Sequence, residues 1–156
     1  MLVNDGTGSG QPILAPYEPP GTDFTVEAEI QIVKVMNAGS IVGRTDEGVV
    51  ARSAVDGGGF LAGYCASALV IVPCGDTNEV FGIYSADSQV VATLPTKRDA
   101  AWHTYRFTVR GDNLALSIDG TQVADGIDNR YLNNRAVGLW ARGIQVNVRA
   151  FRVFVP

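Results

Sequence analysis

The chain has 156 residues, 46% of them hydrophobic and 18% charged, which predicts one domain with its own core and excludes a disordered tail. The net charge of −4 argues against a nucleic-acid partner, because phosphate binding needs a clustered excess of Lys and Arg. No apolar run approaches the roughly 20 residues that a spanning helix needs, so we expect no direct insertion into a membrane.

The first elements in chain order are an irregular segment and a long strand. Residues 1–22 contain four prolines, so we expect an extended lead-in that packs on the domain edge. Residues 23–35 then alternate strictly between apolar and polar side chains, which predicts a strand with one buried face. The apolar positions are Phe24, Val26, Ala28, Ile30 and Ile32. We therefore divide the chain into a lead-in, 1–22, and a single β-domain, 23–156.

Several short strands are predicted after this long one, separated by residues typical of turns. The strands lie near 40–44, 48–54, 59–66, 69–72, 80–85 and 89–94. The turns lie at 36–39, 56–58, 75–76 and 86–88. No segment has convincing helical periodicity.

The stretch from Ala101 to Gly126 predicts a hairpin and the start of a further strand. Its apolar positions alternate first over 105–109 and again over 114–118, with a turn at 111–113 between them. Asp119-Gly120 makes a second turn of the kind that requires positive φ. Two long strands, 135–142 and 144–155, end the chain. Strands and turns at this spacing predict an all-β, antiparallel sandwich or barrel.

Three segments resemble the concanavalin A-like lectin/glucanase superfamily: DFTVEAEI, WHTYRFTVRGDNLALSIDG and AVGLWARGIQVNVRAFRVF. Among its branches, they are most similar to the laminin-G-like and keto-disaccharide hydrolase-like domains of bacteria. The resemblance implies an antiparallel two-sheet jelly roll. It implies less about function, because this fold hosts lectins, carbohydrate-binding modules, glycosidases and sensor domains.

A candidate ligand site lies on the strand predicted at 135–142. If Val137, Leu139 and Ala141 face the core, then Trp140 and Arg142 face outward, where an indole is costly to leave in water. Sugar rings present apolar C–H faces that stack on aromatic rings, and arginine suits the hydroxyls. The open alternative is that a loop or the lead-in covers Trp140. The predicted ligand-binding residues are Trp140, Arg142, Tyr64, Tyr84 and Arg52.

Glu27 and Glu29 form a weaker, catalytic candidate. Laminarinase-type glucanases of the same superfamily place three acids at alternate strand positions, and a retaining mechanism needs two carboxyls about 5–5.5 Å apart. Here the third position is Gln31, whose amide cannot deliver a proton. The competing interpretation is a solvated strand face.

Metal and cysteine chemistry leave alternatives open. We expect no cofactor. Calcium is an alternative implied by the superfamily, with Asp112 and Asp119 as candidate donors, although both suit turns equally well. Cys65 and Cys74 lack the further ligands of a zinc site, and are either a cross-strand disulfide or two buried thiols. His103, the only histidine, is expected to be structural or at the surface.

The resulting hypothesis is a non-catalytic, carbohydrate-binding, lectin-like module of a larger extracellular or cell-surface bacterial protein, with a glycan as its partner. One alternative is a structural or sensory extracellular domain of a receptor-type, kinase-linked protein. The other is a glycoside hydrolase that uses Glu27 and Glu29. The oligomeric state is left open.

Overall fold

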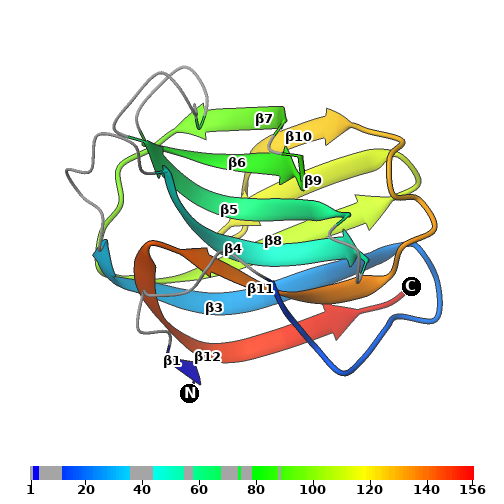
Figure 1. Cartoon of the computed structure of the whole chain (residues 1–156), viewed down its shortest axis with the longest axis horizontal. Helices are drawn as coiled ribbons and strands as arrows, with labels where there is room; N and C mark the ends of the chain where they lie inside the picture. The colour runs from blue at the N-terminus through cyan, green and yellow to red at the C-terminus, as the bar shows by residue number, and fades with distance from the viewer. Residues whose placement is uncertain are drawn as a thin grey trace.

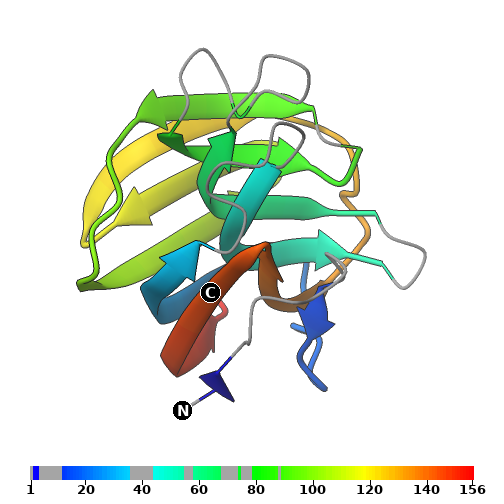
Figure 2. The same cartoon turned by 60° about the vertical axis from the view of Figure 1, so that its left-hand side comes forward.

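The structure is a computed structural model that describes residues 2–3, 12–35, 44–54, 58–67, 74, 79–87 and 89–156. It confirms the predicted all-β sandwich: two antiparallel six-stranded sheets pack face to face as two layers (Figures 1 and 2). All elements within these residues are strands. Accordingly, no helix in this part of the chain could cross a membrane.

Sheet A combines the longest strands of the chain with the predicted hairpin. In spatial order it contains β1 (Leu2–Val3), β12 (Ile144–Phe154), β3 (Phe24–Val35), β8 (Trp102–Arg110), β9 (Asn113–Ile118) and β10 (Thr121–Ile127). The turn between β9 and β10 has φ of 52° at Asp119 and 82° at Gly120, which confirms the predicted positive-φ turn.

Sheet B contains most of the short strands. In spatial order it consists of β2 (Ile13–Leu14), β11 (Ala136–Arg142), β4 (Arg44–Ser53), β5 (Phe60–Ser67), β6 (Glu79–Ser85) and β7 (Val90–Pro95). The lead-in therefore contributes one two-residue edge strand to each sheet, β1 beside β12 and β2 beside β11.

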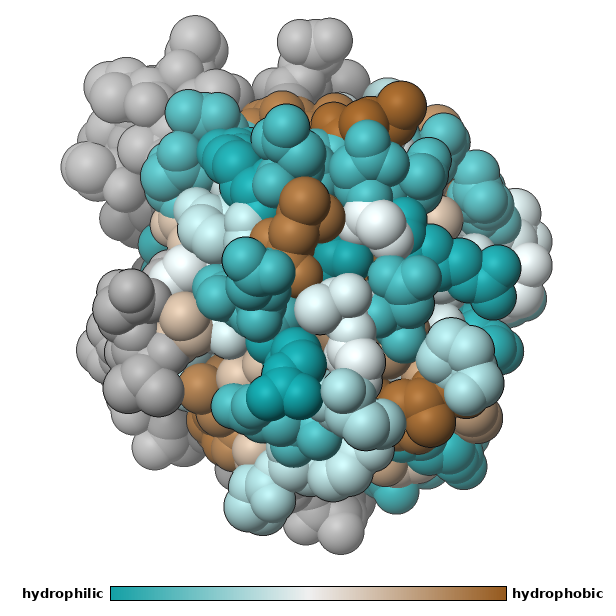
Figure 3. Space-filling view, turned by 90° about the vertical axis from the view of Figure 1, so that its right-hand side faces the viewer, coloured by the Kyte–Doolittle hydropathy of each residue, from teal (hydrophilic) through white to brown (hydrophobic). Residues whose placement is uncertain are grey.

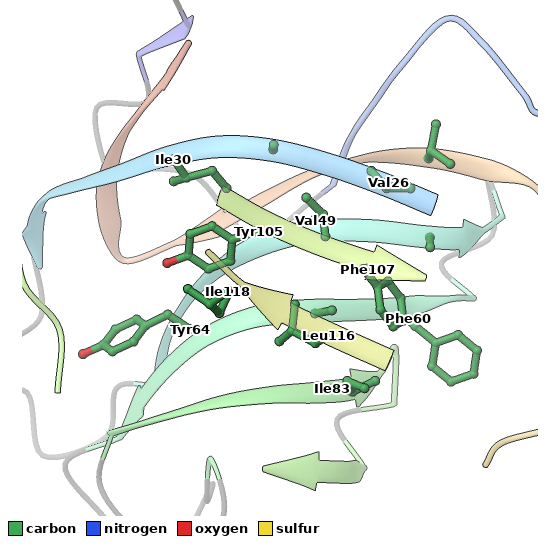
Figure 4. Close-up of a cluster of buried hydrophobic side chains, with 14 of the residues drawn as sticks. Val26, Ile30, Val49, Phe60, Tyr64, Ile83, Tyr105, Phe107, Leu116 and Ile118 are labelled. Carbon is green, nitrogen blue, oxygen red and sulfur yellow. The ribbon is translucent and has the colours of Figure 1, made fainter. Parts of the chain in front are cut away.

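The core lies between the sheets and follows the period-two pattern of the sequence. On β3, Val26, Ala28 and Ile30 are buried against Phe107 of β8 and Leu116 of β9, as the alternation predicted. Figure 4 shows Ile30, Phe107 and Leu116 of sheet A gathered in one cluster with Val49, Phe60 and Ile83 of sheet B. The polar residues that alternate with these apolar ones face away from the core. At the end of the sandwich seen in Figure 3, the described surface is largely hydrophilic, with separate hydrophobic spots.

One prediction is wrong: the two strands expected at 40–44 and 48–54 are a single strand where the structure describes them. β4 runs unbroken from Arg44 to Ser53, and Asp46 and Glu47 pair within it with Cys65 and Tyr64 of β5. Both acids are fully buried, although their composition is typical of a turn. Residues 40–43, the strand expected at 69–72 and most of the turns at 36–39, 56–58 and 75–76 lie outside the described residues.

The close pairing of β4 with β5 depends on a cross-strand pair of glycines, Gly48 and Gly63. A Cβ at Gly63 would lie 2.0 Å from the Glu47 carbonyl oxygen and 2.6 Å from Gly48 Cα. Both are backbone atoms of a central strand and cannot move aside. We expect Gly63→Ala to lower the free energy of unfolding by about 1–3 kcal/mol or more, measured by urea denaturation. Gly21→Ala, with no atom within 4 Å of the new Cβ, is the control; equal midpoints for both variants would contradict the prediction.

Candidate functional site

The predicted outward face of β11 carries an aromatic and a cationic side chain joined by a buried acid. Val137 is buried, and Leu139 packs against the core, so Trp140 and Arg142 project from the outer face of sheet B. Asp46 lies directly opposite Arg142 on the neighbouring strand β4. We call Trp140, Arg142 and Asp46 together the Trp140 surface.

Asp46 fixes both of its partners. The indole Nε1 of Trp140 donates to Asp46 Oδ1 at 2.6 Å, and Arg142 donates through Nε to Oδ1 at 3.1 Å and through Nη2 to Oδ2 at 2.6 Å. The carboxylate is fully buried, while 35% of the Arg142 side chain is exposed. The guanidinium carbon lies 5.6 Å from the centroid of the Trp140 ring. The aromatic face and the cation are therefore held rigidly together at the surface.

The strands beside Trp140 carry a row of paired glycines. Gly48 lies opposite Trp140, Gly63 pairs with Gly48, and Gly82 pairs with Gly63, so three strands in succession present glycine in one row. Because side chains alternate along a strand, all three positions lie on the outer face. All three glycines are buried, and the Tyr84 side chain lies over Gly82.

The structure does not bring Tyr64 and Tyr84 to this surface as exposed ligand contacts. Tyr64 points inward from β5 and is 1% exposed, packed in the core between the sheets. Tyr84 lies on the outer face of β6 but is also 1% exposed, and its hydroxyl donates to the Cys74 carbonyl oxygen at 2.6 Å. β5 and β6 are buried on both faces, so their alternation could not reveal which residues face outward.

Arg52 is also displaced from its predicted role. It is fully buried near the end of β4, has a φ of 50°, and donates through Nη2 to the Thr22 carbonyl oxygen at 3.1 Å. The same Nη2 lies 3.9 Å from Asp23 Oδ1. Burial lowers the pKa of Arg52, while Asp23 and Asp112 oppose that shift. The positive φ takes Arg52 out of the regular strand alternation, which is why the sequence pattern misplaced it.

Cys65 and Cys74 form a disulfide in the structure. With Val80 and Tyr84 they make a small buried cluster on the outer side of sheet B. The bond ties β5 to the chain that precedes β6. It therefore holds Cys74, whose carbonyl oxygen accepts the hydrogen bond from the Tyr84 hydroxyl, against sheet B.

Glu27 and Glu29 lie on the outer face of sheet A among arginines from the neighbouring strands. Glu27 Oε1 lies 3.0 Å from Arg152 Nη1, and Glu27 Oε2 lies 3.6 Å from Arg106 Nη1. Glu29 Oε2 lies 2.5 Å from Arg149 Nε, and Glu29 Oε1 lies 3.2 Å from Arg152 Nη1. The hydrogen bonds from Arg149 and Arg152 lower the pKa of Glu29. A carboxyl group stabilised in its charged form is a poor proton donor, so this arrangement favours the interpretation as a solvated, ion-paired face.

His103 joins three segments at one end of the sandwich. Its Nδ1 is 2.6 Å from Asp119 Oδ2, after β9, and its Nε2 is 2.8 Å from Asp99 Oδ1, before β8. Asp119 also accepts a hydrogen bond from the Thr104 backbone. This His103 clamp was not predicted, because the two aspartates lie 4 and 16 residues away and meet only through the hairpin.

The residues considered for calcium are separated in the structure. Asp119 is engaged in the His103 clamp, and Asp112 accepts a hydrogen bond from its neighbour Asn113 at 3.0 Å. Within the described ranges, no group of three or more His, Cys, Asp or Glu side chains could hold a metal ion.

Comparisons with known proteins relate the chain to solved structures. No protein-family model and no curated protein sequence matches it. The carbohydrate-binding module CBM66 from Bacillus subtilis is 19% identical with a TM-score of 0.70, over 98% of this chain and 86% of that chain. A beta-1,3-glucanase from Mycobacterium marinum is 17% identical with a TM-score of 0.59, over 92% of this chain and 67% of the other.

Sheep galectin-11, solved in complex with glycerol, is 11% identical with a TM-score of 0.56, over 92% of this chain and 98% of that one. At these identities the comparisons establish the fold alone. The chain therefore shares the fold of these structures, a two-sheet jelly-roll sandwich.

The His103 clamp makes a pH-dependent contribution to stability. Burial alone would lower the pKa of His103, but the hydrogen bonds with Asp119 and Asp99 together raise it above its usual 6.5. The hydrogen bond with His103 lowers the pKa of Asp99 below 3.8. Burial alone would raise the pKa of Asp119, but its hydrogen bonds with His103 and the Thr104 backbone lower it below 3.8. Stability from a raised histidine pKa is present below 6.5 and lost as the pH rises through the folded value. Stability from the carboxylates is present above 3.8 and lost toward lower pH.

We therefore expect His103→Gln to be most destabilising, relative to the unsubstituted chain, between about pH 4 and pH 6.5. The difference between the two proteins should shrink at higher pH, as the histidine of the unsubstituted chain loses its proton. Urea unfolding at a series of pH values measures it. A difference that stays constant from pH 5 to pH 9 would contradict a charged clamp.

Proposed function

We propose that this domain is a non-catalytic carbohydrate-binding module that holds a glycan on the Trp140 surface. One observation carries the proposal: a fully buried Asp46 carboxylate fixes a partly exposed tryptophan and an arginine on the outside of a sheet. Burying a carboxylate is costly unless its oxygens are bonded, so the anchor keeps both partners in place. A surface that is ordered before binding loses less conformational entropy on binding.

Trp140 would provide the apolar contact. A sugar ring has C–H groups on its faces and hydroxyls around its rim, and an indole face complements the first of these. Trp140 Nε1 is already bonded to Asp46, and its ring is thus offered as a stacking face.

Arg142 would provide the hydrogen bonds. Its Nε and Nη2 are bonded to Asp46, whereas Nη1 has no hydrogen-bond partner within the described residues. A guanidinium group carries fixed, coplanar donors that suit neighbouring hydroxyl oxygens. Asp46 would act as a positioning residue and would not touch the glycan.

The cellular context is also a proposal. The fold is shared with proteins described as a carbohydrate-binding module, a beta-1,3-glucanase and a galectin, which supports a glycan as the partner. The arginine-paired state of Glu27 and Glu29 supports a non-catalytic role. The Cys65–Cys74 disulfide supports an oxidising compartment. We infer an extracellular module of a larger bacterial protein, of the laminin-G-like branch.

The test is a binding screen of the purified domain on polysaccharides and immobilised glycans, followed by titration of any hit. We expect Trp140→Ala to weaken the affinity at least about 30-fold, the effect of losing a central aromatic contact worth about 2 kcal/mol. Trp102→Ala is the matched control, because Trp102 is the other tryptophan and lies on sheet A under Arg149, 4.6 Å from its ring.

Loss of binding in Trp140→Ala, with the fold retained by circular dichroism and Trp102→Ala binding unchanged, supports the Trp140 surface. Loss in Trp102→Ala alone would move the glycan site to sheet A. The absence of any binding partner in a broad screen of well-folded protein would contradict the glycan function.

A further inference from the structure

Three arginines lie on the face of sheet A that points away from the core. Arg106 of β8 and Arg149 and Arg152 of β12 surround the two glutamates of β3. Arg152 and Arg106 pair in register with Glu27 from either side, so one row across three strands carries a cation, an acid and a second cation. We call the three arginines together the arginine layer.

Positive charge is outermost in this cluster. The side chains of Arg106, Arg149 and Arg152 are 50%, 53% and 49% exposed, whereas those of Glu27 and Glu29 are 13% and 20% exposed. The carboxylates therefore lie beneath the guanidinium groups. The cluster has one cation in excess, although the whole chain has a net charge of −4. A ligand that approaches this part of sheet A meets the guanidinium groups first.

The arginine layer keeps donors that the glutamates do not use. Each of the four carboxylate oxygens of Glu27 and Glu29 faces an arginine. Within the described residues, however, Nη1 and Nη2 of Arg149 and Nε and Nη2 of Arg152 have no hydrogen-bond partner. The glutamates thus hold the guanidinium groups in place while their own acceptors are occupied. What the layer offers to a ligand is coplanar, charged donors, which suit an oxyanion.

Aromatic rings lie against two of the three guanidinium groups. The guanidinium carbon of Arg149 is 4.6 Å from the centroid of the Trp102 ring, and that of Arg106 is 5.1 Å from the centroid of the Phe154 ring. A cation over an aromatic face is favourable, so these rings help to fix the arginines. Phe154 is itself 41% exposed, and apolar surface therefore borders the cations. The C–H face of a sugar ring complements such a surface, whereas an inorganic anion does not.

We propose that the arginine layer is a second binding site, for an acidic polysaccharide whose carboxylates or sulfate esters accept the free guanidinium donors. Arg106 and Arg152 are two strand spacings apart, about 10 Å at the backbone, so charged groups along one polymer chain can reach both. Three arginines in a chain of net charge −4 are few for a nucleic acid, which disfavours that class of polyanion. The arginine layer lies on sheet A and the Trp140 surface on sheet B, and the inference does not depend on the glycan function of the Trp140 surface.

Calorimetric titration of the purified protein with polygalacturonate and with dextran sulfate tests the proposal and distinguishes the two oxyanions. At least one of them should bind, more weakly as the salt concentration rises, and uncharged dextran should not displace it. Arg149→Gln and Arg152→Gln should each weaken the affinity about 10-fold, the effect of losing a hydrogen bond between charged groups. Arg149→Lys, which keeps the charge and loses the coplanar donors, should also weaken it. Circular dichroism checks that each variant is folded.

Arg135→Gln is the matched control. It removes the same charge from an arginine that is also partly exposed and ion-paired, 3.4 Å from Glu18, but lies just before β11 on sheet B. Its affinity for the acidic polysaccharide should stay close to that of the unsubstituted chain. Trp140→Ala should leave this binding intact too, so the two proposed sites can fail separately. If neither acidic polysaccharide binds, if Arg135→Gln weakens binding as much as Arg149→Gln, or if double-stranded DNA binds as tightly, the proposal is wrong.

Discussion

Two adjacent carboxyl groups buried in a central strand determine the chemistry at one end of this domain. Asp46 and Glu47 follow each other on β4, and the alternation of a strand sends them to opposite faces of sheet B. On the outer face, Asp46 gains an arginine and an indole as partners. On the inner face, Glu47 gains none in the described residues, so burial favours its protonated form. The same two-residue segment thus places a paired carboxylate on the outer face and a carboxyl group that burial keeps largely protonated on the inner face.

The strands of sheet A could be read from the sequence because one of their faces is solvated. β3, β8 and β9 alternate apolar and polar side chains over their whole length, so period, burial and register agree. In sheet B the strands predicted at 59–66, 80–85 and 89–94 match β5, β6 and β7 within one residue. Their inward and outward faces could not be assigned, because β5 and β6 are buried on both faces and lose the alternation. Thr45, Asp46 and Glu47 resemble a turn in composition, yet tertiary partners on β5 and β11 keep them in a strand. Local preference was overridden there by contacts that no local pattern contains.

Only part of the candidate site could be predicted from the sequence. Trp140 and Arg142 face outward, as the apolar alternate positions of β11 indicated. Their anchor could not be found, because Asp46 lies 94 residues from Trp140 and meets it only through the pairing of β11 with β4. The His103 clamp depends in the same way on the hairpin register. A sequence pattern can identify residues of a suitable type, but which of them meet depends on the pairing of strands that are distant in the sequence.

The two-residue strands β1 and β2 have a consequence for the behaviour of the protein in solution. Each covers only part of a much longer neighbour, β12 or β11, on the same side of the sandwich. A long, regular edge strand offers a row of unpaired amides to any other chain and invites edge-to-edge aggregation. Within the described residues, the lead-in therefore covers part of the outer strand of each sheet on that side. Backbone amides that are paired in this way are withheld from any other chain.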